Sequence, residues 1–292
     1  MGGCLAARFA SVLAAAAALA GCAASASGPA WPAAGSESHL RAADERRIDT
    51  CTDALDAPRH AAVGALDAAR IDLVNWNIKK KSIPTWREDY SRLTRGTELI
   101  LIQEAALRAD TIVALPAVPH WSFAPGYRAD GAVTGVLTLS SVEPLTRCSF
   151  VTTEPVLRTP KATSITQFRL AGRPDTLLVI NVHAVNFSFG LGAYKRQFEQ
   201  IAGVLEDHEG PVILSGDLNT WRAGRMHAVD ALAAAYGLEA LAFGDALADD
   251  HRSRFFGRPL DHIYVRGLEP VSAHISDVSS SDHNPLSVTF AL

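Results

Sequence analysis

Carboxylate, amide and imidazole side chains recur in this chain directly after short apolar stretches. Glu104 follows the apolar run Leu99 to Ile102, where an acidic side chain is costly unless it is paired or binds a metal ion. A glutamate exposed to water at a strand end is the alternative. Because polar residues follow other apolar stretches too, we favour a metal ligand and hydrolytic chemistry assisted by a cation.

A second polar group is the segment Ser215-Gly216-Asp217-Leu218-Asn219. Its glycine allows a tight exit from a strand, and Asp217 and Asn219, two residues apart, can point the same way. Asp217 can accept a hydrogen bond from water, and Asn219 can donate one to phosphate. A turn followed by a helix cap would use the same residues, so this segment alone is a weak signal.

Further carboxylates and a histidine lie near the end of the chain. Asp282 and His283 come just before the apolar stretch Leu286 to Phe290, and Asp261 lies at the start of another. A histidine there can take up a proton near neutral pH or, when charged, bind phosphate. One carboxylate can orient the ring while the other helps to hold the cation. For an aspartate and a histidine that lie this close in sequence, a simple hydrogen bond within a loop is the alternative.

Seven short apolar runs, typical of buried strands, separate these groups. They are Ile71–Ile78, Glu98–Gln103, Val133–Leu139, Thr176–His183, Val212–Gly216, Leu260–Val265 and Leu286–Phe290. The clearest helix lies near Ala193–His208, where Phe198, Ile201 and Leu205 recur on one face.

Two segments of the chain share one order of elements: a strand, a helical stretch and a second strand. The first joins 71–78 to 98–103, and the second joins 176–183 to 212–216. Such crossovers are right-handed and make their two strands parallel. The four strand ends are then expected on one rim, where ligand sites in sheet proteins gather. The polar residues at these ends would converge there: Asn77, Glu104, His183, Asp217 and Asn219.

Taken in chain order, these residues resemble the endonuclease/exonuclease/phosphatase superfamily, which includes DNase I, apurinic endonucleases, inositol-phosphate phosphatases and bacterial sphingomyelinases. The resemblance spans about Ile71 to Leu292, and the segments 181–188 and 256–261 look closest to the bacterial YafD-type branch. It implies a four-layered α/β sandwich, in which two packed mixed β-sheets are flanked by helices. The matching positions are Asn77, Glu104, His183, Asp217, Asn219, Asp261, Asp282 and His283.

The resemblance implies a metal site formed by Asn77, Glu104 and Asp282. The expected ion is Mg²⁺ or Mn²⁺, which would polarise the phosphate of a phosphodiester substrate. An endonuclease-like hydrolase is the leading expectation. The alternatives are a phospholipid or sphingomyelin-type phosphodiesterase, a phosphomonoesterase, and a catalytically silent binding module on the same fold.

The resemblance also implies five catalytic residues. Asp217 would align a water molecule for in-line attack and Asn219 would bind phosphate, while His283, steadied by Asp261, would accept a proton or stabilise the phosphoryl charge. Family members with a histidine at the His183 position often hold its ring with a carboxylate on a neighbouring strand, and residues 134–141 offer none. His183 is therefore expected to bind phosphate first and to act as an acid second.

Basic and aromatic side chains lie near these positions. Lys79 directly follows the Asn77 strand and Lys161 is expected in another loop, so each can bind phosphate, although a solvated turn explains them equally well. Aromatic side chains that follow His183 and Asn219 either form a wall for a base or an acyl chain or pack into the core. They are Phe187, Phe189, Tyr194 and Trp221.

Composition restricts the partners. The chain has 292 residues, of which 48% are hydrophobic, so there is enough apolar material for one catalytic domain. Its formal charge of −4 means that no global positive field favours nucleic acid. The phosphodiester substrate, whether nucleic acid or a phospholipid head group, must be held locally. A monomer is expected.

The N-terminal segment 1–21 has the pattern of an export signal, with Arg8 before an apolar run. It ends in Leu19-Ala20-Gly21-Cys22, which resembles the lipobox of bacterial lipoproteins. We expect an exported protein that is anchored to a bacterial membrane by a lipid on Cys22 and faces the periplasm or the outside. No acidic residue stands at 23 or 24, which favours the outer membrane. An ordinary cleavable signal or a short buried helix is the alternative.

Residues 22–69 are expected to form a tether rich in Ala, Ser, Gly and Pro, and residues 70–292 the catalytic domain. Cys51 and Cys148 would remain in an oxidising compartment once the leader is removed and Cys22 is acylated. A disulfide between them would close a loop of about 100 residues and contribute about 4 kcal/mol in the chain-entropy model. Two unrelated buried thiols are the alternative.

Overall fold

The computed structural model describes residues 51, 55, 64–79, 85–108, 118–129, 132–244 and 251–292. All of them belong to one compact unit. The expected leader 1–21, the acylation site Cys22 and most of the tether 22–69 lie outside the described residues. None of the helices in the described ranges combines the length and apolarity that crossing a bilayer requires.

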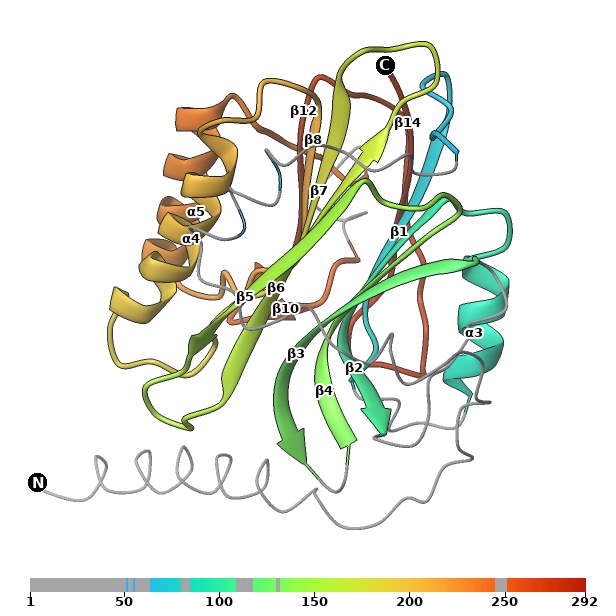
Figure 1. Ribbon diagram of the computed structural model, residues 1–292. Coiled ribbons are helices and arrows are strands. Elements are labelled where there is room, and N and C mark those ends of the chain that lie inside the picture. Colours follow the sequence, from blue (N-terminus) through green and yellow to red (C-terminus); the bar gives the residue numbers. More distant parts are fainter. Residues whose placement is uncertain are drawn as a thin grey trace, which may run out of the picture. The chain divides into compact units, whose positions relative to one another are not determined.

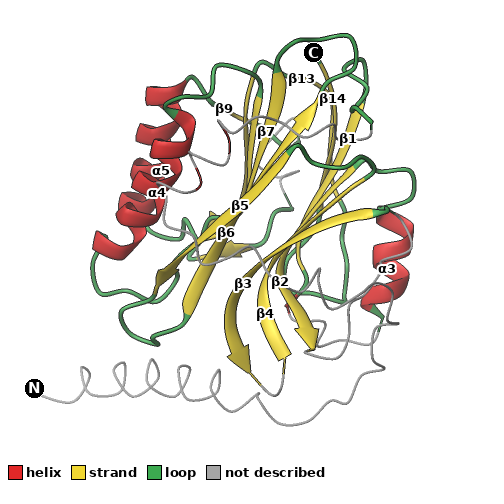
Figure 2. Ribbon diagram, viewed as in Figure 1, coloured by secondary structure: helices red, strands yellow, loops and turns green. Residues whose placement is uncertain are grey.

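Two six-stranded mixed sheets form the centre of the unit (Figures 1 and 2). The first contains β1 (Ile71–Asn77), β2 (Leu99–Arg108), β3 (His120–Ala129), β4 (Ala132–Ser140), β13 (Glu269–Ile275) and β14 (Leu286–Ala291), in the order β13-β14-β1-β2-β4-β3. The second contains β5 (Thr146–Thr153), β6 (Pro160–Arg169), β7 (Thr176–His183), β8 (Val212–Asp217), β9 (Glu239–Ala240) and β12 (Asp261–Arg266), in the order β5-β6-β7-β8-β12-β9. A short hairpin of β10 (Arg254–Phe255) and β11 (Arg258–Pro259) precedes β12.

Helices cover the outer faces of both sheets. Helix α3 (Trp86–Leu93) lies on the first sheet, and α4 (Gly192–Leu205) and α5 (Ala223–Tyr236) lie on the second (Figure 1). A third apolar cluster fills the space between the sheets, where side chains such as Leu73 and Val179 are fully buried. Because the strands carry apolar residues on both faces, they need cover on both faces. The arrangement is a DNase I-like α/β sandwich of four layers, as expected from the sequence.

All seven strands expected from the apolar runs are present, together with the helix near 193–208. β1 pairs with β2 in parallel, and so does β7 with β8, as the two crossovers predict. The prediction for β2 was wrong at its end, because the strand continues past Gln103 to Arg108 through an irregularity between Ile102 and Ala105. A bulge bends a strand and redirects one side chain, and here that residue is Glu104.

The N-terminal boundary of the packed unit lies before residue 70. Leu66 is buried between the sheets, and its backbone bonds to Arg169 and Ala171. Cys51 is buried against the second sheet and forms a disulfide with Cys148 of β5, across 97 positions of sequence. Part of the segment expected to be a tether therefore belongs to the folded core.

Candidate active site

The carboxyl ends of β1, β7 and β8 meet at one rim, beside the irregularity of β2 that carries Glu104. Asn77 ends β1 in the first sheet, and Asp217 ends β8 in the second. The Asn77 side-chain amide donates a hydrogen bond of 3.1 Å to Oδ2 of Asp217. Residues that are 140 positions apart are thus in contact across the two sheets.

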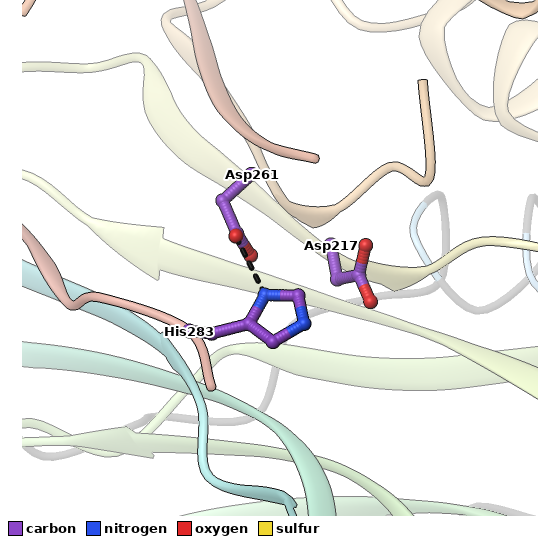
Figure 3. A group of neighbouring side chains, drawn as sticks. All are labelled: Asp217, Asp261 and His283. Carbon is purple, nitrogen blue, oxygen red and sulfur yellow. Dashed lines mark hydrogen bonds and ion pairs between the residues drawn. The ribbon is translucent and has the colours of Figure 1, made fainter. Parts of the chain in front are cut away.

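Asp217, Asp261 and His283 form a compact group (Figure 3). Asp261 pairs with Asp217 in the antiparallel register of β12 and β8. Oδ2 of Asp261 accepts a hydrogen bond of 2.7 Å from Nδ1 of His283, and the carboxyl group of Asp217 lies on another side of the ring. Because a carboxylate only accepts, Nδ1 carries a proton and Nε2 is the atom available to a substrate.

The electrostatics of this group reflect its burial. Burial alone would lower the pKa of His283, but the carboxylates of Asp261, Asp217 and Asp282 raise it to about 10. Burial raises the pKa of Asp217 to about 6, with His283 acting against the rise and Asp261 adding to it. The positive charges of His283 and Lys161 therefore stabilise the carboxylate of Asp217 against its burial.

The backbone around His283 is fixed to β1. The indole N–H of Trp76 donates to the His283 carbonyl at 2.9 Å. The hydroxyl of Ser281 donates to the Asn77 carbonyl at 2.6 Å and accepts from the His283 N–H at 3.1 Å. These bonds place a loop from the far end of the chain against the strand that carries Asn77.

His183 lies beside a lysine and two carboxylates. Nζ of Lys161 lies 2.9 Å from Nε2 of His183, whereas Asp217 and Glu104 lie at 3.7 and 3.9 Å from the same atom. The prediction that Lys161 lies in a loop was wrong, since it is the second residue of β6 and is buried. An ammonium group only donates, so Nε2 of His183 accepts in this contact.

Glu154 supports this lysine from the turn between β5 and β6. Its buried carboxylate lies 3.9 Å from Nζ of Lys161 and accepts from the backbone N–H groups of Asn186 and Phe187 at 2.6 and 3.1 Å. It also accepts from the hydroxyl of Thr159. A glutamate in a turn is usually solvated, so the sequence carried no signal for this role.

The remaining expected residues lie at the margin of the site. Asp282 forms an ion pair of 2.9 Å with Lys79, and both side chains are about half exposed. Asn219 has a positive φ, its backbone N–H donates to Asp217, and its side-chain amide donates to the Ala184 carbonyl at 3.1 Å. In this conformation, Asp282 and Asn219 bind protein groups.

Two structural features around the site were not found from the sequence. Arg225 of α5 is buried and donates to the carbonyls of Val185, Asn186 and Asn219. These bonds join the loop that follows β7 to the loop that follows β8. A single arginine in an alanine-rich helix does not predict such a role from the sequence.

Gln103 links the two sheets below the site. Its side-chain amide donates to Asn75 at 2.9 Å and to Asn181 at 2.7 Å. Gln103, Asn75 and Asn181 are each polar residues within an apolar strand, and this position in the sequence indicates a buried hydrogen bond.

The residues present fit a divalent cation. Asp261 is neutralised by His283, which leaves the buried Asp217 and the nearby Glu104 as carboxylates that need positive charge. Ligand atoms of Asp217, Asp261 and His283 lie within 4.8 Å of one another. Asp261 and His283 are already bonded to each other through the Nδ1 proton of His283. We therefore favour Glu104 and Asn77 as the ligands of the ion, with Asp217 beside them.

Comparisons with known proteins agree on the architecture. Residues 67–283 match the sequence model of the Endonuclease/Exonuclease/phosphatase family. A UPF0294 protein from Vibrio vulnificus is 36% identical over 226 residues, which cover 76% of this chain and 78% of that protein.

Solved structures of the same fold are more distant in sequence. An endonuclease/exonuclease/phosphatase from Beutenbergia cavernae superposes with a TM-score of 0.60 at 16% identity, covering 77% of this chain and 72% of the other. D. rerio TDP2 in complex with a single strand DNA product gives a TM-score of 0.53 at 16% identity, covering 76% of this chain and 99% of the other. At these identities the likeness shows the fold.

Proposed function

Because the chain belongs to the endonuclease/exonuclease/phosphatase family, we propose that it is a metal-dependent phosphodiesterase. The contact that carries the proposal is the meeting of Asn77 with Asp217 across the sheets, beside the Asp261–His283 pair. Buried carboxylates, a hydrogen-bonded imidazole and a buried lysine at one rim are the groups that phosphodiester hydrolysis requires.

A bound Mg²⁺ or Mn²⁺ would offset the charge of the phosphate. Glu104 and Asn77 would hold it, and Asp282 could join them if its pair with Lys79 opens. The positive φ of Glu104 directs its side chain toward His183 and away from the strand register. Such backbone conformations cost energy in non-glycine residues and are concentrated at functional sites.

Side chains of the protein would carry out the separate steps of the hydrolysis. Asp217 accepts a hydrogen bond from water and takes its proton as the water oxygen attacks phosphorus. The P–O bond on the opposite side breaks, and the departing alkoxide takes a proton from solvent to leave as the alcohol. Nε2 of His283 is turned toward the site because Asp261 holds Nδ1, and it donates a hydrogen bond to a phosphoryl oxygen because the neighbouring carboxylates keep the ring charged. Lys161 places a positive charge beside His183, where a second phosphate oxygen would lie.

Turnover of bis-p-nitrophenyl phosphate tests the proposal. Purified protein should release nitrophenol with Mg²⁺ or Mn²⁺, and excess chelator should abolish the reaction. Glu104→Ala and His283→Ala should each lower kcat/KM by about a hundredfold or more with unchanged circular dichroism.

Glu269→Ala and His274→Ala provide matched controls, because both side chains are exposed on β13 and lie outside the site. Their rates should equal that of the parent protein. Near-normal rates for Glu104→Ala or His283→Ala would refute the assignment. Faster cleavage of p-nitrophenyl phosphate than of the diester would indicate a phosphomonoesterase instead.

A further inference from the structure

Exposed apolar side chains gather around the candidate site. In the described part of the chain, seven large hydrophobic side chains are exposed, and six of these lie in three loops at the rim. Phe189 and Phe256 protrude furthest, with 93% and 76% of their surface exposed. We call the six residues the apolar rim: Val156, Leu157, Phe187, Phe189, Phe255 and Phe256.

Strand pairing places these loops on the same side as the site. β6 runs antiparallel to β7, so the turn between β5 and β6, which carries Val156 and Leu157, lies beside the carboxyl end of β7. Phe187 and Phe189 follow that end directly. β12 runs antiparallel to β8, so the hairpin that precedes it lies beside Asp217.

Direct contacts join the three loops into one surface. Glu154 accepts hydrogen bonds from the backbone N–H groups of Asn186 and Phe187, which ties the turn between β5 and β6 to the loop after β7. The indole N–H of Trp221 donates to the Asn186 side chain at 2.8 Å. The Trp221 ring lies 5.8 Å from the ring of Phe255, edge to face. The apolar rim is therefore supported from below.

The exposed charge on the loops that carry the apolar rim is positive, and one exposed carboxylate, that of Asp277, lies 3.8 Å from His251 at the start of the last loop. The loop stretches 154–159, 184–191, 218–222 and 251–260 contain no exposed acidic residue, although the whole chain has a formal charge of −4. Their exposed charged residues are Arg158, Arg222, Arg254 and Arg258. A surface that is apolar at its tips and positive between them complements a partner with a negative surface over an apolar interior.

An anionic lipid bilayer has this chemistry. Aromatic and aliphatic side chains enter the boundary between head groups and acyl chains, while arginines bind the anionic head groups. Single-stranded nucleic acid would use the faces of aromatic rings. Val156 and Leu157 have no such face, and Phe189 stands almost wholly clear of the protein.

We propose that the apolar rim and its arginines dock the site onto an anionic lipid bilayer. If the chain is the phosphodiesterase proposed above, its substrate is a phosphodiester presented at the surface of that bilayer. This consequence rests on the proposed function, whereas the docking itself does not. The orientation follows from the geometry, because the rim surrounds the ends of β7 and β8, where His183 and Asp217 lie.

Co-sedimentation with vesicles tests the docking. The chain from residue 31 is used, because this unit contains every described residue and the disulfide but neither the apolar leader nor Cys22. It should bind vesicles of phosphatidylcholine mixed with phosphatidylglycerol, and bind less to phosphatidylcholine alone. The double variant Phe189→Ser/Phe256→Ser should bind the mixed vesicles roughly tenfold more weakly or worse.

Val271→Ser is the matched control, because Val271 is the seventh exposed hydrophobic residue, 67% exposed on β13 and away from the rim. It should bind like the parent chain. Equal binding by the double variant and the parent would overturn the proposal. Binding of a single-stranded oligonucleotide that the double variant loses, without vesicle binding, would also overturn it and identify a nucleic-acid platform.

Turnover of soluble bis-p-nitrophenyl phosphate separates the two proposals. Vesicle binding without turnover would refute the proposed function and leave the docking surface intact. Turnover without vesicle binding would refute the docking alone. The double variant should retain the parent's rate on this soluble substrate, since neither phenylalanine belongs to the catalytic group.

Discussion

Asp217 carries a negative charge where the surroundings disfavour it. Burial raises the pKa of its carboxyl group to about 6, even though Asn77 donates to one oxygen and the Asn219 N–H to the other. The folded protein accepts this cost at the position where it would orient water. Active sites often contain such a conflict, because groups arranged for chemistry are not arranged for stability.

Asp217→Asn should therefore stabilise the metal-free protein at neutral pH. The pKa of Asp217 is higher in the folded state than its usual value of 3.8, so folding stability falls as pH rises from about 4 to about 6 and stays low above that. The amide does not titrate. Urea unfolding in chelator should show a gain of roughly 1 to 3 kcal/mol at pH 7 that shrinks toward zero at pH 4. A variant less stable than the parent at pH 7 would contradict this.

Individual site residues could be predicted from the sequence where a polar side chain interrupts or ends an apolar run. Glu104 and Asp217 stand out in the sequence because each follows an apolar run. Lys161 and Glu154 do not, because β6 is rich in Ser and Thr and was not recognised as a strand. The lysine beside His183 could only be found once the strands were paired.

Gly216 controls the approach of β7 to β8. Its φ is +148°, and a Cβ atom there would lie 1.9 Å from the carbonyl oxygen of Val182. The register sets Val182 opposite Gly216 and His183 opposite Asp217. A side chain at this position must push the two strands apart next to His183 and Asp217.

Gly216→Ala should consequently lower both stability and turnover. We expect a loss of about 2 kcal/mol or more in the free energy of unfolding, and at least a tenfold loss in kcat/KM. Gly172→Ala is the control, because Gly172 also has a positive φ, +73°, but a Cβ atom there would meet nothing within 4 Å. It should cost about 1 kcal/mol and leave turnover unchanged. Equal effects of the two substitutions on turnover would exclude the strand-spacing explanation.

Strands with a continuous apolar sequence were predictable, whereas edge strands and the buried but Ser- and Thr-rich β6 were not. β7 is buried along its whole length, and its continuous apolar sequence identified it. β13 is exposed along much of its length and β5 at both its ends, so neither contains an uninterrupted apolar run. The hairpin of β10 and β11 consists of two-residue strands, which leave no periodicity to detect.

On the scale of the whole molecule, the site exists only where the two sheets meet. Asn77 and Glu104 come from the first sheet, and Asp217 and His183 from the second. The apolar layer between the sheets and the bonds from Gln103 to Asn75 and Asn181 hold the two halves together. From the parallel crossovers we expected all four strand ends on one rim, although each crossover by itself aligns only the two strands of its own half. The packing of one half against the other came from the family resemblance, because residue spacing does not encode it.

A double-mutant cycle across the sheets tests this joint site most directly. kcat/KM for bis-p-nitrophenyl phosphate would be measured with Mg²⁺ for the parent, Glu104→Gln, Asp217→Asn and the double variant. Each single substitution should cost about a hundredfold or more, and the double variant should be little slower than the slower single one, because residues that act as a unit are not additive. Losses that multiply, or a near-normal rate in either single variant, would contradict a single site built from both sheets.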